Sequence, residues 1–227
     1  MYRYETHLHT APVSKCATAD VENNLRFYKD QGYQGVFITD HFLNGNLNME
    51  NSEDYKKRVE FYYSSYEEAK ELSDKIGIDV FTGVELSYKG TDFLVYGLDK
   101  AWFLENRHWQ DMKISELLLF LKESSALVIQ AHPFRMAAYI DHIRLFPHCI
   151  HGVESFNACR DSLTNDMAAL FAKKYELLEI AGTDNHSGSR KKTIAGMEFD
   201  TPLKDERDFV NRILAKEGRQ FVVKLGE

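Results

Sequence analysis

The chain repeats one local pattern, an apolar run that ends in a histidine or a carboxylate. Five segments have this form: His7-Leu8-His9, Thr39-Asp40-His41, Gly83-Val84-Glu85, Ala131-His132-Pro133 and Gly182-Thr183-Asp184-Asn185-His186. Because side chains alternate along an extended segment, His7 and His9 lie on one side of the chain and Leu8 on the other. The recurrence predicts a set of strands whose ends meet at one polar, metal-binding site.

Strand-like and helical segments alternate along the chain. Short apolar runs predict strands at residues 3–8, 35–39, 79–85, 93–96, 126–131, 152–155, 177–181 and 220–224. Apolar residues at helical spacing predict helices at residues 20–31, 52–76, 114–123, 165–175 and 204–215. This alternation favours an α/β fold with a mostly parallel sheet. Seven core strands favour a closed or nearly closed barrel. An open doubly wound sheet is the alternative, without a G-x-G-x-x-G or P-loop sequence to support nucleotide binding.

The chain is long enough for one barrel of this type. It has 227 residues, 44% of them hydrophobic, and no linker or low-complexity tract divides it. We therefore expect a single domain over residues 1–227. In such barrels the active site lies at the carboxyl ends of the strands, where most of the histidines and carboxylates fall. Asp92 comes at the start of its strand instead, which fits an antiparallel strand or a different strand boundary.

Charge and composition exclude several classes of protein. The formal net charge is -7 and there is no long basic block, which disfavours long nucleic acid as a partner. No run approaches about 18 apolar residues, so we expect no membrane span. The N-terminus lacks the apolar stretch of a signal peptide, and three widely spaced cysteines do not form a disulfide framework. We therefore expect a cytoplasmic protein, and its oligomeric state stays open.

The polar strand ends carry ligands for divalent metal ions. Imidazole and carboxylate together suit zinc, manganese or iron, and a carboxylate such as Glu85 can bridge two ions. Eight candidates exceed the needs of one tetrahedral ion and predict two or three: His7, His9, His41, Glu85, Asp92, His132, Asp184 and His186. Paired metal ions act on the attacking and leaving oxygens of a phosphate ester and lower the pKa of bound water. No side-chain nucleophile is then required.

The five segments, in this order, resemble the motifs of the PHP (polymerase and histidinol phosphatase) domain superfamily, from the first strand to about residue 190. The resemblance implies a distorted, TIM-like (β/α)7 barrel, a two- or three-metal centre and phosphoesterase activity. It also implies the ligand sets: a first metal at His7, His9, Glu85 and Asp184, a second at Glu85, Asp92 and His132, and part of a third at His41 and His186.

Two positions depart from the family pattern. Many members carry an aspartate or histidine about six residues after the second histidine of the first motif, where this chain has Lys15 beside Cys16. A protonated lysine cannot bind a cation, so the third site is weak or empty, uses Cys16, or leaves Lys15 to contact a substrate phosphate. Asp92 stands where many members have a histidine. A carboxylate is the harder ligand, which favours manganese or iron slightly over zinc.

Other polar residues are candidates for roles around the metals. Arg135 and Arg160 follow strand ends, and a guanidinium binds phosphate bidentately, so each is a candidate phosphate contact, with a surface ion pair as the alternative. His41 and His186 are the candidate proton donors to the leaving group. Two carboxylates are expected to orient ligands by hydrogen bonds, Asp40 and Glu154.

The sequence therefore predicts a metal-dependent phosphoesterase that hydrolyses a small-molecule phosphomonoester with metal-activated water. Histidinol phosphate, a nucleotide bisphosphate, a phosphotyrosyl peptide and a nucleic-acid end all fit superfamily chemistry as substrates. The alternative is a non-catalytic, metal-stabilised barrel that binds a partner or a polymerase subunit. A third possibility is amidohydrolase chemistry, which the lack of an evident metal-bridging lysine after a central strand disfavours.

Overall fold

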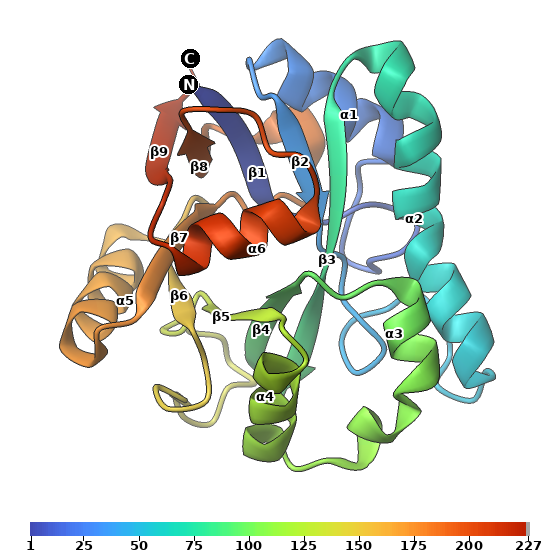
Figure 1. The fold of residues 1–227 in the computed structure, drawn as a ribbon, viewed down its shortest axis with the longest axis vertical. Helices are drawn as coiled ribbons and strands as arrows, with labels where there is room; N and C mark the ends of the chain where they lie inside the picture. Colours follow the sequence, from blue (N-terminus) through green and yellow to red (C-terminus); the bar gives the residue numbers. More distant parts are fainter. Residues whose placement is uncertain (226–227) are drawn as a thin grey trace.

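One mixed sheet curves into a nearly closed barrel in the computed structural model, which describes residues 1–225 (Figure 1). Its strands within that range are β1 (Tyr2–Leu8), β2 (Gly35–Ile38), β3 (Asp79–Tyr88), β4 (Thr91–Tyr96), β5 (Leu127–Ala131), β6 (Gly152–Asn157), β7 (Leu178–Gly182), β8 (Thr193–Phe199) and β9 (Arg219–Lys224). Their order in the sheet is β7-β6-β5-β4-β3-β2-β1-β8-β9. The predicted α/β, TIM-like barrel is confirmed.

Helices pack around the sheet, and all of the α-helices except α4 follow an aspartate. They are α1 (Val21–Asp30), α2 (Tyr55–Ile76), α3 (Lys100–Glu105), α4 (Ile114–Glu123), α5 (Ser162–Tyr175) and α6 (Glu206–Leu214), with short 3-10 helices at Arg107–Asp111 and Gly188–Arg190. In all of the α-helices except α4, an aspartate side chain accepts a backbone N–H of the first turn, which satisfies an otherwise unpaired donor. Over residues 1–225, no helix has the length and apolar character needed to cross a membrane.

The barrel closes at the carboxyl ends of its parallel strands. Strand β1 pairs with β2 and β2 with β3 in parallel, and β5, β6 and β7 form a second parallel set. The chain beyond β7 then pairs with the end of β1, where Leu8 bridges Asn185 and the His9 N–H donates to the Asn185 carbonyl at 3.0 Å. This closure brings the first and last of the polar strand ends together.

Strand β4 runs antiparallel to both of its neighbours. Asp92 at its start therefore lies at the same end of the barrel as the ends of β3 and β5, which resolves its unusual sequence position. Tyr96 lies at the opposite end, where its ring packs 5.0 Å from that of Phe209 on α6. Phe209 also packs on Phe37 at 4.4 Å, so α6 lies across the barrel at the end away from the polar strand ends (Figure 1).

The sequence analysis missed the regular structure of two segments. Residues 193–199 form β8, and residues 100–111 contain two short helices, although neither segment was predicted. Strand β8 is buried on both faces at its centre, so it lacks the alternation that marks a half-buried strand. It also contains Gly196, where an added Cβ would lie 2.1 Å from the Tyr4 carbonyl oxygen on β1. Glycine is required there because the two backbones approach so closely.

Gly196→Ala should therefore cost much more stability than an alanine placed in open space. We expect the free energy of unfolding to fall by about 2–3 kcal/mol, because β1 and β8 must move apart to make room for the new Cβ. Gly32→Ala is the control: its new Cβ meets nothing within 4 Å, although φ is +79°. That variant should lose only about 1 kcal/mol. Urea denaturation measures both, and equal losses would contradict the close approach at Gly196.

Candidate metal centre

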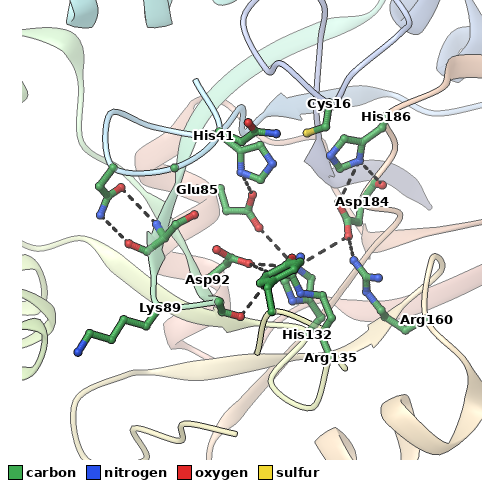
Figure 2. A pocket seen from close by; sticks show the side chains of 16 residues that line it. Cys16, His41, Glu85, Lys89, Asp92, His132, Arg135, Arg160, Asp184 and His186 are labelled. Carbon is green, nitrogen blue, oxygen red and sulfur yellow. Dashed lines mark hydrogen bonds and ion pairs between the residues drawn. The ribbon is translucent and has the colours of Figure 1, made fainter. Parts of the chain in front are cut away.

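The polar strand ends surround one cavity of about 620 Å³ (Figure 2). Six of the eight candidate ligands line it: His41, Glu85, Asp92, His132, Asp184 and His186. His7 and His9, on the end of β1, are fully buried and are not part of the wall. The structure thus brings together residues that are up to 179 positions apart, between His7 and His186.

Three groups of side chains have donor atoms close enough to hold a metal ion. Within each group the atoms lie within 4.8 Å of one another: His7, His9 and Asp184; His7, Glu85 and His132; and His9, His41 and His186. Asp92 belongs to none of these groups within residues 1–225. Its Oδ2 lies 4.0 Å from His132 Nε2 and 3.1 Å from the Arg135 guanidinium. The buried clusters offer ligands for more than one ion.

Glu85 joins the clusters through its two oxygens. Its Oε1 lies 3.3 Å from His7 Nε2 and 3.4 Å from His132 Nε2. Its Oε2 lies 3.4 Å from His9 Nε2 and 2.6 Å from His41 Nδ1. Burial alone would raise the pKa of Glu85, but His41 and His7 hold it well below its usual range. Neither oxygen has a hydrogen-bond partner of good geometry in the described chain, so this ionised, buried carboxylate needs a cation beside it.

The protonation of His9 follows from Ser14. The Ser14 hydroxyl donates its single proton to Asp40 Oδ1 at 2.6 Å, so it can only accept from His9 Nδ1, 3.1 Å away. Burial, His186 and His41 together hold the pKa of His9 well below its usual value, which keeps the ring neutral. With its proton on Nδ1, His9 turns the lone pair of Nε2 towards the centre.

His7 has a matching contact on the other side. Its Nδ1 lies 2.9 Å from Glu154 Oε1, and its Nε2 lies 3.1 Å from His9 Nε2. Two nitrogen ligands at 2.0–2.1 Å from one metal ion lie roughly 3.0–3.4 Å apart. Burial lowers the pKa of His7, but Glu154, Asp184 and Glu85 outweigh this and raise it well above its usual value. The distance between these two nitrogens therefore fits a cation held between the His7 and His9 rings.

Asp40 and Glu154 make hydrogen bonds of the predicted kind, although Asp40 reaches its histidine only through Ser14. Asp40 accepts hydrogen bonds from Thr10, Ser14 and Ser65, and it acts on His9 through Ser14. Glu154 contacts His7 directly. Its Oε2 accepts hydrogen bonds from the backbone N–H of His132 and from the side-chain amide of Asn157. Such contacts fix ring orientation and increase the basicity of a metal-binding histidine.

Two of the candidate ligands have strained backbones. His132 has φ of 27° and Asp184 has φ of 56°, in the region that L-residues rarely adopt. Strain of this kind costs roughly 1–3 kcal/mol and persists where the surrounding structure enforces it, often at functional sites. The strained backbone places both side chains on the cavity wall.

Arg135 and Arg160 both line the cavity, as predicted, but each pairs with a candidate metal ligand. Arg160 lies 2.7 Å from Asp184 Oδ2, and Arg135 lies 3.1 Å from Asp92 Oδ2 (Figure 2). The Nε atoms of both are buried and have no hydrogen-bond partner in the described chain. The ion pairs are thus inside the centre rather than on the outer surface, and phosphate contact by these arginines stays a prediction.

Lys15 and Cys16 have different surroundings. Lys15 is exposed and lies against residues 45–51, outside the wall of the main cavity, so the structure does not support its contact with a substrate phosphate there. Cys16 lines the cavity. Burial alone would raise the pKa of the Cys16 thiol, but the neighbouring His186 and His41 lower it to about 6.

Several residues of the centre were not predicted from the sequence. Ser14 carries no signal except its place one position before Lys15. Asn157, which contacts both Glu154 and Asp184, follows the strand that carries Glu154. Lys89 and Tyr139 line the cavity from loops, which a search for strand ends does not reach.

Comparisons with known proteins support the fold. No family model matches the chain, and no curated protein matches its sequence. Among solved structures, it matches a two-domain protein from Bacteroides vulgatus that contains a predicted PHP-like metal-dependent phosphoesterase, with 13% identity and a TM-score of 0.65 over 97% of this chain and 64% of that one. The chain has the PHP-like fold. It spans less than two thirds of that two-domain protein.

Two further structures match over nearly the whole of both chains. One is a candidate metal-dependent phosphoesterase from Bifidobacterium adolescentis, with 15% identity, a TM-score of 0.56, and coverage of 94% of this chain and 96% of that one. The other is an amidohydrolase from Chromobacterium violaceum with bound sulfate and no metal, with 13% identity, a TM-score of 0.58, and coverage of 99% and 98%. The structural neighbours thus include proteins described as metal-dependent phosphoesterases and one described as an amidohydrolase.

Ser14→Ala should weaken metal binding, because His9 then loses the acceptor that fixes its proton on Nδ1. We expect the affinity for the first metal ion to fall about 10–100-fold, as is usual for such supporting contacts. Ser65→Ala is the matched control, since Ser65 also donates to Asp40 but touches no histidine. Chelator competition measures both affinities. Equal losses in the two variants would contradict the role of Ser14 in orienting His9.

Proposed function

We propose that this protein is a metal-dependent hydrolase that acts on a small phosphomonoester. The observation that carries the proposal is Glu85, an ionised and buried carboxylate whose two oxygens each face two imidazole nitrogens. Such an arrangement suits a carboxylate shared by two metal ions. The PHP-like fold and the two arginines on the cavity wall further support a phosphorylated substrate.

The close groups of donor atoms support most of the ligand sets that the sequence suggested, although Asp92 belongs to none of these groups within residues 1–225. His7, His9 and Asp184 would hold one ion and His132 and Asp92 a second, with Glu85 between them. When bound, divalent ions of manganese, iron or zinc lower the pKa of water and draw charge from phosphate oxygens. The chain itself orients these ligands, through Ser14 for His9 and through Glu154 for His7.

The arginines would bind the phosphate and steady its developing negative charge. A guanidinium stays charged at any relevant pH and matches two phosphate oxygens in its planar geometry. Arg160 already contacts Asp184, so it would both orient that carboxylate and offer its remaining N–H groups to the cavity. Arg135 is placed in the same way by Asp92. Their position in the wall limits the substrate to one whose phosphate reaches between them.

His41 and His186 lie on the side of the cavity across from the arginines (Figure 2). Their side chains are 12% and 26% exposed, so a proton could pass from either one to the leaving oxygen of a substrate in the cavity. They serve this role only while they do not hold a metal ion themselves.

His132→Ala should abolish most turnover while the fold persists. With manganese, iron or zinc added to the metal-free protein, a screen of phosphate esters should show phosphate release by the wild type. The variant should lose about 10³-fold or more in kcat/KM, because the second ion loses a ligand. His148→Ala is the control, since His148 packs on Tyr175 outside the centre. Metal binding without release from any ester would instead favour the non-catalytic barrel, and release from amides alone would favour an amidohydrolase.

Arg160→Met should lower kcat about 10²–10³-fold, because a charged donor to the transition state is removed. It should also weaken inhibition by inorganic phosphate. Arg26→Met is the control, as Arg26 pairs with Glu22 on the exposed face of α1. Steady-state kinetics with the best ester from the screen measure both variants. An unchanged kcat for Arg160→Met would contradict a role in phosphate binding.

A further inference from the structure

A second cavity, of about 510 Å³, lies at the end of the barrel away from the metal centre. Part of its wall is Gly97, which follows β4, whereas Asp92 of the metal centre lies near the start of that strand. The helices α2 and α3 and the start of α6 provide most of the remaining wall (Figure 1). The lining includes the aromatic rings of Tyr63 and Tyr66 on α2 and of Trp102 on α3.

One buried polar group in this wall has no partner. The Tyr63 hydroxyl makes no hydrogen bond within residues 1–225, although the residue is only 2% exposed. Buried hydroxyls are rarely left in this state, because the loss of hydration is then uncompensated. Both neighbouring tyrosines do have partners: Tyr62 donates to the Gly83 carbonyl at 2.5 Å, and Tyr66 donates to Glu206 Oε1 at 3.4 Å. Because Tyr63 lines the cavity, a ligand there can supply the missing partner.

The surroundings of this hydroxyl are negatively charged. Burial raises the pKa of Tyr63 well above its usual value, and the charges of Asp99 and Glu206 raise it further. In the described chain, neither of these carboxylates forms an ion pair with a lysine or an arginine, and both line the cavity. Lys100, also in the wall, is already paired with Glu67 at 2.7 Å. The cavity therefore favours a ligand with a positive charge.

Arg207 is the other cation in the wall, and it makes an anion the rival ligand. Its guanidinium already donates hydrogen bonds to the carbonyls of Ser125 and Gly97. An anion that reached the Tyr63 hydroxyl would also have to approach the nearby carboxylates, which like-charge repulsion disfavours.

We propose that this cavity binds a small organic ammonium ion. Its N–H groups would donate to the Tyr63 hydroxyl oxygen and to the Glu206 carboxylate. Its apolar part would pack against the aromatic rings of the wall, whose faces also attract cations. This site is separate from the metal centre, so the proposal does not depend on the activity proposed there.

Calorimetric titration with benzylammonium and with benzoate tests the proposal, because the two probes carry the same ring and opposite charges. We expect the wild type to bind benzylammonium about 10-fold or more tightly than benzoate. Tyr63→Phe should bind benzylammonium about 10-fold less tightly, since a hydrogen bond to a charged group is lost. It should fold normally, because it removes only a hydroxyl without a partner. Tyr175→Phe, on the exposed end of α5, is the matched control and should keep the wild-type affinity.

Crystals soaked with benzylammonium locate the bound probe. Its nitrogen should lie about 3 Å from the Tyr63 hydroxyl. The proposal is overturned if the wild type fails to bind benzylammonium, if benzoate binds equally well or better, or if Tyr63→Phe keeps the wild-type affinity. Ordered water on the Tyr63 hydroxyl, with the probe bound elsewhere, would overturn it as well. None of these results bears on the metal centre, which metal binding and phosphate release test separately.

Discussion

The buried centre depends on a positive charge between two imidazole rings. Nε2 of His7 and Nε2 of His9 lie 3.1 Å apart. The Ser14 hydroxyl donates to Asp40 and so forces the His9 proton onto Nδ1, which leaves a bare lone pair on Nε2. Without a metal ion, a proton on His7 supplies the charge, and the raised pKa of His7 is consistent with this. A divalent ion held by His7 and His9 would replace that proton and balance the charges of Glu85 and Asp184 as well.

Much of the surrounding fold holds the side chains that surround this positive charge. The pairing of Leu8 with Asn185 closes the barrel at this end and places Asp184 opposite β1. Asp40 is fully buried, and its hydrogen bonds to Thr10, Ser14 and Ser65 tie the first loop and α2 to the centre. Because a buried charge without partners is costly, each of these contacts restricts where the metal-binding side chains can lie.

The sequence predicted the elements that have a clear apolar pattern and the site residues that directly follow a strand. Apolar runs located most strands, and the polar residue after each run located the centre, because parallel strands end at one edge of a sheet. Strand β8 was missed because it is buried on both faces around Gly196. The pairing of Arg160 with Asp184 could not be predicted either, since it depends on where separate loops meet in space. Ser14 was missed for the same reason: a lone serine becomes informative only beside His9 and Asp40.

The cavity also brings together groups for two chemical tasks, metal binding and phosphate binding. His7 and His9 are buried behind the cavity, while the other candidate ligands line it together with Arg135 and Arg160. A substrate phosphate in this cavity would thus meet the guanidinium groups close to the metal-binding carboxylates, which is the basis for the proposed phosphoesterase activity.

Anomalous X-ray diffraction from crystals grown with zinc or manganese at neutral pH tests directly whether a metal ion lies between His7 and His9. We expect an anomalous peak about 2.0–2.2 Å from Nε2 of both His7 and His9, with a second peak on the far side of Glu85. A refined structure without these peaks, in which His7 Nε2 still faces Glu85 directly, would contradict it.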